Sequence, residues 1–174
     1  MTTDADKSKN LFVTLVFVVF GGPGIIGVYL PAWITRWRIP HDAGLSSRLA
    51  AIVLIAIGLL PLGESIARFV RKGQGTLSPT HPTETLVATG FYRYVRNPMY
   101  LGVLTLLAGQ ALLFESRALW QYLAWVAVGF HLFAVFYEEP TLRKKYGAGY
   151  DAFCRNVPRW LPRLTPWINA DERT

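Results

Sequence analysis

The chain has 174 residues, about one domain, of which 52% are apolar, 14% aromatic and only 17% charged, a composition too apolar for an ordinary soluble domain. Its net charge of +7 comes from cations that lie between apolar runs and not along one basic stripe, so we expect no nucleic acid and favour anionic lipid as a partner. The single cysteine, Cys154, excludes an intrachain disulfide and a cysteine-based metal site; we expect no metal and interpret Cys154 as a packing residue. These properties predict one all-α integral-membrane domain over residues 1–174, with the bilayer as its solvent.

Two apolar runs in the first half predict membrane-spanning helices. Residues 11–33 carry no charge, and such a run is long enough to cross the hydrocarbon layer with some tilt. Glycines and a proline at 21–24 predict a kink there. A cleaved signal peptide is the competing interpretation, but the run continues to Leu30 and no Ala-x-Ala site is evident. Residues 49–70 predict the second span.

Glu64, inside the second run, is a functional candidate because a carboxylate in a membrane helix is costly. Arg68 follows one turn later, so an ion pair at the level of the lipid headgroups explains this glutamate as well as a role in a site does. The following loop, residues 73–89, is rich in glycine, proline, serine and threonine and is long for a simple connection. We therefore expect a binding loop or a disordered one.

The second half predicts a hairpin of two further spans and a short helix at the membrane interface. Residues 99–114 form a third, short span, and residues 118–137 return as the fourth. Small residues recur on the third span at helical spacing, namely Gly102, Thr105 and Gly109. Such a strip predicts close packing against a neighbouring helix. Residues 150–156 have the pattern of a short amphipathic helix.

The distribution of lysine and arginine predicts the orientation of the four spans. If both ends of the chain face the cytoplasm, fourteen of these cations lie inside and only four outside. The positive-inside rule therefore favours a cytoplasmic location for residues 73–98 and for the C-terminal segment.

Residues 86–102 are the most informative stretch, because an arginine-bearing aromatic loop enters an apolar helix there. Pro98 suits the first turn of a helix beginning near Met99, and the free N–H groups of that turn, with Arg93 and Arg96, form an expected anion site. A simple interfacial anchor has the same composition. The topology brings the glutamates at 138 and 139 opposite this site, which predicts a pocket with a cationic and an anionic wall that suits a zwitterion.

His131 lies two helical turns before these glutamates, on nearly the same face of the fourth span. It is either part of the same site or a histidine that is simply hydrogen-bonded inside the bundle, and spacing alone favours the second interpretation.

Two motifs at matching separation resemble a known family. They are Leu86-Val87-x-x-Gly90-x-Tyr92-x-x-x-Arg96-Asn97-Pro98-x-Tyr100-x-Gly102 and Glu138-Glu139-x-x-Leu142-x-x-x-Tyr146-Gly147-x-x-Tyr150, followed by Val157-Pro158. Together they resemble the integral-membrane methyltransferases that include isoprenylcysteine carboxyl methyltransferases and phospholipid N-methyltransferases. The resemblance covers residues 73–163, which we interpret as the catalytic half.

The resemblance implies that S-adenosylmethionine binds between the last helices and a cytoplasmic C-terminal segment that closes the pocket. Carried onto this sequence, the residues along the cofactor are Glu84, Thr85, Leu86 and Val87, and those walling the pocket are Tyr92, Asn97, Pro98 and Tyr100. Either Glu138 or Glu139 takes the cofactor's ammonium group. The candidate catalytic residues are Arg96, Glu64 and His131. A neutral amine acceptor needs a base, and Glu64, His131 or one of the paired glutamates could serve.

The sequence departs from the family in ways that bear on the acceptor. Asn97 stands where many eukaryotic relatives have histidine, and Ala134 and Val135 stand where the isoprenylcysteine enzymes carry an arginine for the substrate carboxylate. We therefore favour a phospholipid amine, or another small lipophilic acceptor, over a prenylcysteine carboxylate. A membrane reductase of the group related to sterol reductases, and a non-catalytic membrane subunit or small transporter, are the alternatives.

Overall fold

The computed structural model describes residues 24–40, 44–72 and 89–168, and within helix 45–72 the side chains only as far as residue 64. In these ranges the chain is helical, with no β-strand. The expected first span is thus described only from residue 24 onward, and the loop at 73–88 lies outside the described residues. The bounds of the helices are η1 Ile25–Tyr29, α3 Leu30–Thr35, α4 Leu45–Lys72, η2 Gly90–Arg93, α5 Pro98–Leu113, α6 Arg117–Phe133, η3 Ala134–Glu138, α7 Glu139–Tyr146 and α8 Ala148–Asn156.

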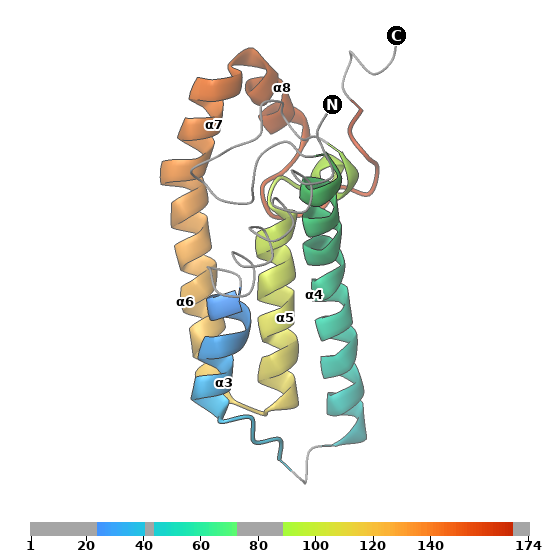
Figure 1. Cartoon of the computed structure of the whole chain (residues 1–174), viewed down its shortest axis with the longest axis vertical. Helices are drawn as coiled ribbons and strands as arrows, with labels where there is room; N and C mark the ends of the chain where they lie inside the picture. The colour runs from blue at the N-terminus through green and yellow to red at the C-terminus, as the bar shows by residue number, and fades with distance from the viewer. Residues whose placement is uncertain (1–23, 41–43, 73–88, 169–174) are drawn as a thin grey trace.

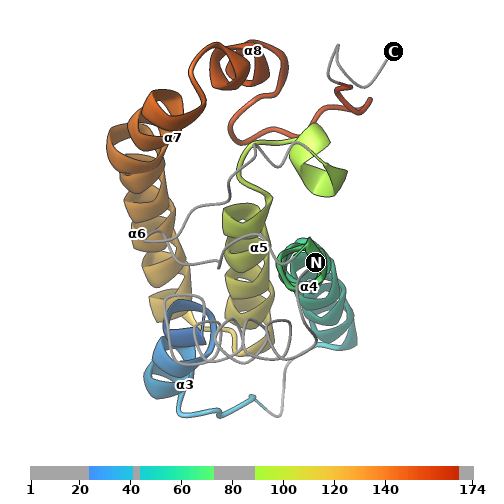
Figure 2. The same ribbon diagram turned by 45° about the horizontal axis from the view of Figure 1, so that its top comes forward.

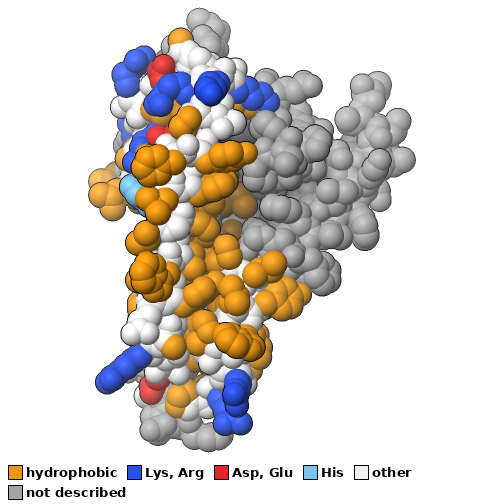
Figure 3. All heavy atoms as spheres, turned by 90° about the vertical axis from the view of Figure 1, so that its left-hand side faces the viewer, with side chains coloured by type: hydrophobic (Ala, Val, Ile, Leu, Met, Phe, Trp, Pro, Cys, Tyr) orange, Lys and Arg blue, Asp and Glu red, His pale blue; other side chains and the backbone are white. Residues whose placement is uncertain are grey.

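Two of the described helices are long and apolar enough to cross a membrane, namely residues 45–64 of α4 and the continuous helix 117–146. The helices at 25–35 and 98–113 are apolar but shorter. Figure 1 shows α4, α5 and α6 running along the long axis of the molecule, with α3 beside the lower part of α6. Hydrophobic side chains cover the flank seen in Figure 3, and lysine and arginine gather toward its two ends. This pattern is typical of a helical bundle with lipid as its solvent.

The fourth helix is longer than its sequence predicted. We expected it to end near Tyr137, but the helix continues through the π-turn η3 and past Pro140 into α7. Inside that turn the N–H of Glu139 bonds to the carbonyl of Ala134, five residues back. The wider turn lets the helix absorb a proline, which lacks an N–H and clashes with the preceding turn of a regular α-helix. The expected end at Tyr137 was therefore wrong.

Helices α4 and α5 touch backbone to backbone, and Figures 1 and 2 both show them side by side. A Cβ on Gly58 would lie 2.7 Å from the carbonyl oxygen of Gly102, and one on Gly109 would lie 2.9 Å from that of Ala51. Larger side chains would separate the helices, so glycine fixes their distance. The predicted packing role of Gly102 and Gly109 is confirmed.

The first helix is attached to the bundle by side chains that reach its backbone. Pro31 carries no N–H. It therefore cannot donate a helical hydrogen bond to the carbonyl of Ile26 or of Gly27, five and four residues before it. Gln110 Nε2 donates to the carbonyl oxygen of Gly27 at 2.7 Å, and the hydroxyl of Tyr122 donates to that of Ile26 at 3.0 Å. Helices α5 and α6 thereby satisfy backbone groups that the proline leaves open.

The opposite end of the bundle carries α7, α8 and the C-terminal segment 157–168 (Figure 2). Tyr150, Phe153 and Val157 form a small buried cluster in which Trp167 also packs. The amphipathic helix expected at 150–156 is observed as α8, two residues longer at its start. This cluster fixes where the C-terminal segment leaves α8 and turns back toward the start of α5.

Candidate functional site

The loop before α5 is a tight, backbone-bonded structure. Gly90, the first residue of η2, has a φ of 58°, a conformation that favours glycine. The backbone N–H of Phe91 donates to Glu64 Oε2 at 3.3 Å, which joins this loop to α4. Helix α5 begins at Pro98, as its position in the sequence predicted.

The C-terminal segment lies along this loop and bonds to it at three points. The N–H of Arg96 donates to the carbonyl of Pro158, and the N–H groups of Arg163 and Trp167 donate to the carbonyls of Tyr94 and Arg93, all at 2.9 Å. The side chain of Asn97 adds a 3.4 Å bond to the carbonyl of Arg159. Residues separated by more than sixty positions are therefore held together at the start of α5.

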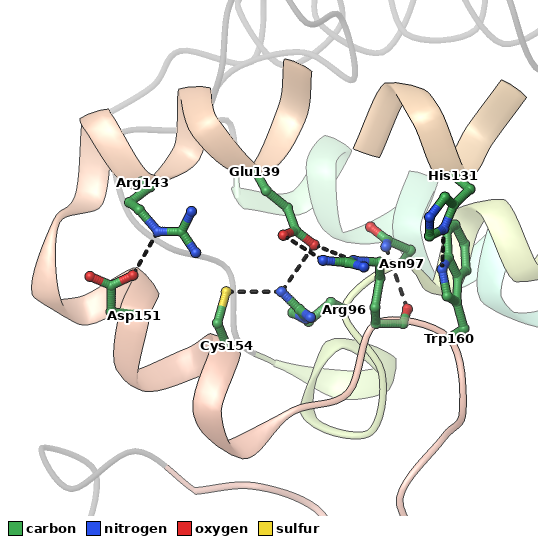
Figure 4. A network of polar contacts seen from close by, with 9 residues as sticks. Arg96, Asn97, His131, Glu139, Arg143, Asp151, Cys154 and Trp160 are labelled. Atoms are coloured by element: carbon green, nitrogen blue, oxygen red, sulfur yellow. Dashed lines mark hydrogen bonds and ion pairs between the residues drawn. The ribbon is translucent and has the colours of Figure 1, made fainter. Parts of the chain in front are cut away.

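Glu139 is the centre of a nearly buried ion-pair cluster that joins the loop before α5, helix α7 and the C-terminal segment (Figure 4). Arg96 Nη1 lies 3.0 Å from Glu139 Oε1, and the two side chains are only 12% and 10% exposed. Arg159 approaches the same carboxylate as a fork, with Nε 2.6 Å from Oε1 and Nη2 2.9 Å from Oε2. Both oxygens of Glu139 are thus engaged by charged donors, the strongest class of protein hydrogen bond.

Two further features of the cluster concern Arg96. Its Nη1 also lies 2.9 Å from Cys154 Sγ, so the cysteine has a polar contact besides its packing role. Its Nε is buried and has no hydrogen-bond partner within the described ranges. Burial of Tyr150 nearby raises the pKa of its hydroxyl, and the hydrogen bond to Glu139 raises the pKa of Arg159. The tyrosine therefore stays neutral and the arginine charged, and the cluster keeps an excess of positive charge.

Glu138 faces a different partner from its neighbour. The hydroxyl of Tyr100 donates to Glu138 Oε2 at 2.8 Å, and the Tyr100 ring stacks on Phe130 with centroids 4.5 Å apart. The other oxygen of Glu138 accepts no bond from any residue that the structure describes. The two adjacent glutamates therefore differ: both oxygens of Glu139 accept bonds from arginines, whereas Glu138 has one oxygen without a partner among the described residues.

His131 belongs to the aromatic edge of this region. Trp160 Nε1 donates to His131 Nδ1 at 3.1 Å (Figure 4), and the Trp160 ring lies between those of His131 and Tyr100, with centroids 6.0 Å and 6.4 Å away. The histidine is exposed and does not bond to either glutamate. It reaches the site only through Trp160 and Tyr100.

The structure brings some of the residues predicted for the site together and places others apart. Arg96 and Glu139 meet as their spacing predicted, but they bond to each other directly instead of standing on opposite walls of an open pocket. Glu64 holds the loop before α5 through Phe91. Tyr92 is half-buried in η2 and Pro98 is buried at the start of α5. The stretch expected to lie along the cofactor, Glu84 to Val87, lies outside the described residues.

Sequence reasoning did not identify Arg159 and Trp160 as site residues. Both directly follow Val157-Pro158, the last element of the second motif, so that motif was the available signal. The resemblance implied that the C-terminal segment closes the pocket, but it did not show which residues of that segment reach the loop before α5, because these contacts join distant parts of the chain.

The fold and the polar cluster define a helical membrane protein with paired glutamates and arginines at one end of its bundle. The chain belongs to the phospholipid methyltransferase family, whose model matches residues 47–149, more than half of the sequence. The matched region runs from α4 into α8 and contains Arg96, Tyr100 and both glutamates. Membership identifies a membrane methyltransferase of lipid-like substrates. No curated protein and no solved structure matches the chain.

Proposed function

We propose that this protein transfers a methyl group from S-adenosylmethionine to the amine of a membrane phospholipid, and that Glu138 is the residue that holds the cofactor's ammonium group. The observation that carries the choice of residue is the division between the two glutamates. Glu139 is already bound by Arg96 and Arg159, whose two positive charges neutralise it and disfavour a third cation beside it. Glu138 keeps one open oxygen, while Tyr100 fixes the other.

The described residues fit the amino acid part of this cofactor, which is a zwitterion. An open carboxylate oxygen on Glu138 suits the ammonium group, and the unpartnered Nε of Arg96 is a donor that suits a carboxylate. A buried donor without a partner costs free energy, and a ligand carboxylate is one group that can accept its hydrogen bond. Arg96 and Glu138 are therefore the proposed cofactor contacts, with Tyr100 positioning the glutamate.

The work of the chain's residues in methyl transfer is alignment and exclusion of water. When bound, S-adenosylmethionine would supply an electrophilic methyl group, which the lone pair of the acceptor nitrogen would take as the electrons of the carbon–sulfur bond return to sulfur. The proton that the nitrogen loses would pass to water. Positive charge disperses in such a displacement, so a dry site that holds the acceptor in line favours it. The stacked rings of Tyr100 and Phe130 supply an apolar wall beside Glu138.

The proposed arrangement in the membrane places this end of the bundle in the cytoplasm, within a multi-pass protein. Helix α7 exposes Arg143, Lys144 and Lys145 there, beside the cluster around Glu139. Cytoplasmic segments of membrane proteins are enriched in such cations, which also attract anionic headgroups.

A phospholipid amine is the proposed acceptor because the described site leaves no second guanidinium donor for an acceptor carboxylate once Arg96 Nε meets that of the cofactor. Ala134 and Val135 are apolar, and both guanidinium groups closest to the glutamates, those of Arg96 and Arg159, are bound to Glu139. The exposed apolar flank of the bundle gives a lipid lateral access (Figure 3).

Calorimetry with the detergent-purified protein tests the cofactor. We expect wild type to bind S-adenosylmethionine or its demethylated product, and Glu138→Gln to weaken binding at least about tenfold, because one charged contact is lost. Glu139→Gln is the matched neighbour and should reduce thermal stability more than binding. Absence of binding by folded wild-type protein would overturn the proposal, and a loss confined to Glu139→Gln would overturn the assignment of Glu138.

The acceptor needs a separate measurement. Radiolabelled methyl transfer is followed with phosphatidylethanolamine and, in parallel, with a prenylcysteine. We expect label in the phospholipid and none in the prenylcysteine; the reverse result would contradict the proposed acceptor.

A further inference from the structure

We infer that the backbone carbonyl of Val135, which Pro140 deprives of a helical donor, forms an alkylammonium site together with the open oxygen of Glu138. The inference rests on the proposed function for the source of the ammonium group, and it assigns an acceptor that no side chain supplies. Its basis is a comparison of two π-turns in this chain, each followed closely by a proline but differing in what surrounds them.

The π-turns η1 and η3 deprive the same two carbonyls of their donors. In each, the N–H of the residue after the turn bonds to the carbonyl of the first residue of the turn, five positions back. Pro31 in one case and Pro140 in the other comes next and has no N–H. The second carbonyl has therefore lost its α-helical donor to the first, and the third faces the proline. These carbonyls belong to residues 26–27 and residues 135–136.

In the first turn, side chains of the bundle replace the missing donors. Tyr122 and Gln110 donate to the carbonyls of residues 26–27, at 3.0 Å and 2.7 Å respectively. In the second turn, no side chain of the described residues donates to the carbonyls of residues 135–136, and the hydroxyl of Thr141 bonds at 2.7 Å to the next carbonyl along. A carbonyl without a donor costs free energy where water is excluded. A donor from outside the chain is therefore expected at the second turn.

Of the two carbonyls in the second turn, that of Val135 lies on the sheltered side of the helix. The side chain of Val135 is half-buried beside the buried Ala134, whereas Phe136 is 74% exposed. Glu138 follows Val135 by three residues, within one helical turn, and one of its oxygens is held by Tyr100 at 2.8 Å. The carbonyl and the open carboxylate oxygen thus belong to neighbouring positions of one short segment.

Two acceptor oxygens without donors in the described ranges suit a cation that carries several N–H groups. Carbonyl and carboxylate oxygens only accept hydrogen bonds, and the carboxylate adds a negative charge. A primary ammonium has three N–H groups and can bond to both oxygens, just as carbonyls at breaks in membrane helices coordinate cations. The amino acid part of S-adenosylmethionine carries such a group. The amine of an ethanolamine phospholipid is the other source of the same chemistry.

Carbon-13 spectroscopy of the carbonyl tests the contact without requiring turnover. Labelling of valine carbonyls and phenylalanine nitrogens selects the three Val-Phe peptide bonds of the chain, and Val135→Ile identifies the signal of residue 135. We expect this signal to move when S-adenosylhomocysteine, the demethylated product, is added. It should stay in place with the deaminated analogue, which lacks the ammonium group. A signal that does not move while S-adenosylhomocysteine binds would overturn the inference.

The same signal distinguishes the two sources of the ammonium group. Short-chain phosphatidylethanolamine, added alone, should leave the Val135 carbonyl signal unchanged. A signal that responds to this lipid but not to S-adenosylhomocysteine would overturn the proposed cofactor contact of Glu138 and leave the ammonium site supported.

A substitution at Pro140 tests the site by supplying the missing donor. Pro140→Ala adds an N–H that competes with a ligand for the carbonyl, so calorimetry should show S-adenosylhomocysteine binding about tenfold more weakly. The affinity for the deaminated analogue, measured in competition, should stay within about twofold. Pro31→Ala is the matched control and should change neither affinity, because the carbonyls of its turn are already bonded by Gln110 and Tyr122.

Hydrogen exchange checks the premise of this substitution. In Pro140→Ala without ligand, the new N–H should exchange slowly, because it bonds within the helix. Fast exchange there, unchanged affinity for S-adenosylhomocysteine in Pro140→Ala, or an equal loss in Pro31→Ala would each overturn the inference.

Discussion

Along the contact between α4 and α5, the two backbones meet through Gly58, Gly102 and Gly109, whereas at the start of α5 the chain is joined to distant segments by the side chains of Glu139 and Arg159. The first contact forms because glycine has no side chain, and van der Waals packing between the two backbones stabilises it. The second depends on charge and on the geometry of a guanidinium fork. The rigid contact fixes where α5 lies, and the polar one brings the C-terminal segment to it. The proposed site is thus built where a fixed element meets a segment that charge holds in place.

The largest effect is expected where the helix backbones touch. In Gly58→Ala the new Cβ would lie 2.7 Å from the carbonyl oxygen of Gly102 and from the nitrogen of Leu106, neither of which can rotate away. We expect a loss of about 3 kcal/mol in the free energy of unfolding. Thermal unfolding in detergent measures it. Gly63→Ala, on the same helix and with no atom of the described residues within 4 Å of the new Cβ, is the matched control and should be neutral or slightly stabilising. Equal behaviour of the two variants would disprove close backbone packing.

The next effect comes from the polar contact. Glu139→Gln removes the charge that Arg96 and Arg159 share and should cost about 2 kcal/mol, less than for a fully buried pair because Arg159 is 28% exposed. The control is Asp151→Asn, which breaks the exposed pair with Arg143. That control should leave the midpoint of thermal unfolding unchanged. An equal shift in both variants would show that burial adds nothing to the cluster.

Local signals in the sequence predicted the parts of this architecture that depend on neighbours along the chain. Helix α5 starts at Pro98 because proline fits a first turn, and the glycines of that helix lie on the face that meets α4. The approach of Arg96 to a glutamate followed from the antiparallel hairpin. Each of these features is a matter of spacing within one or two elements.

The remaining features depend on long-range contacts or on a conflict between local preferences. Pro140 predicts the end of a helix, but the π-turn before it keeps the helix intact and carries Glu139 toward the arginines. Arg159 lies in a proline-rich segment without periodicity, so its position relative to Glu139 depends on long-range contacts of that segment, above all its backbone bonds to residues 93–96. Neither feature could be derived from residue spacing.

A smaller effect is expected at the first helix, where a side chain replaces a missing backbone donor. Tyr122→Phe removes the hydroxyl that donates to the carbonyl of Ile26 and should cost about 1 kcal/mol, because Pro31 supplies no N–H in its place. Thermal unfolding of the purified variant measures the loss. Tyr137→Phe, on the same long helix and exposed, is the control. If the two variants unfold alike, the carbonyl of Ile26 does not depend on Tyr122.

The smallest effect distinguishes charge from geometry inside the polar contact. Arg159→Lys keeps the positive charge but cannot form the two parallel bonds to Oε1 and Oε2 of Glu139, so we expect a stability loss of about 0.5 kcal/mol. Arg155→Lys, at an exposed position of α8, should change nothing. The more sensitive readout is the segment itself: hydrogen exchange should quicken at the N–H groups of Arg163 and Trp167, which bond to the loop before α5. If exchange there stays slow, the backbone bonds alone hold the segment, and the fork serves only to neutralise Glu139.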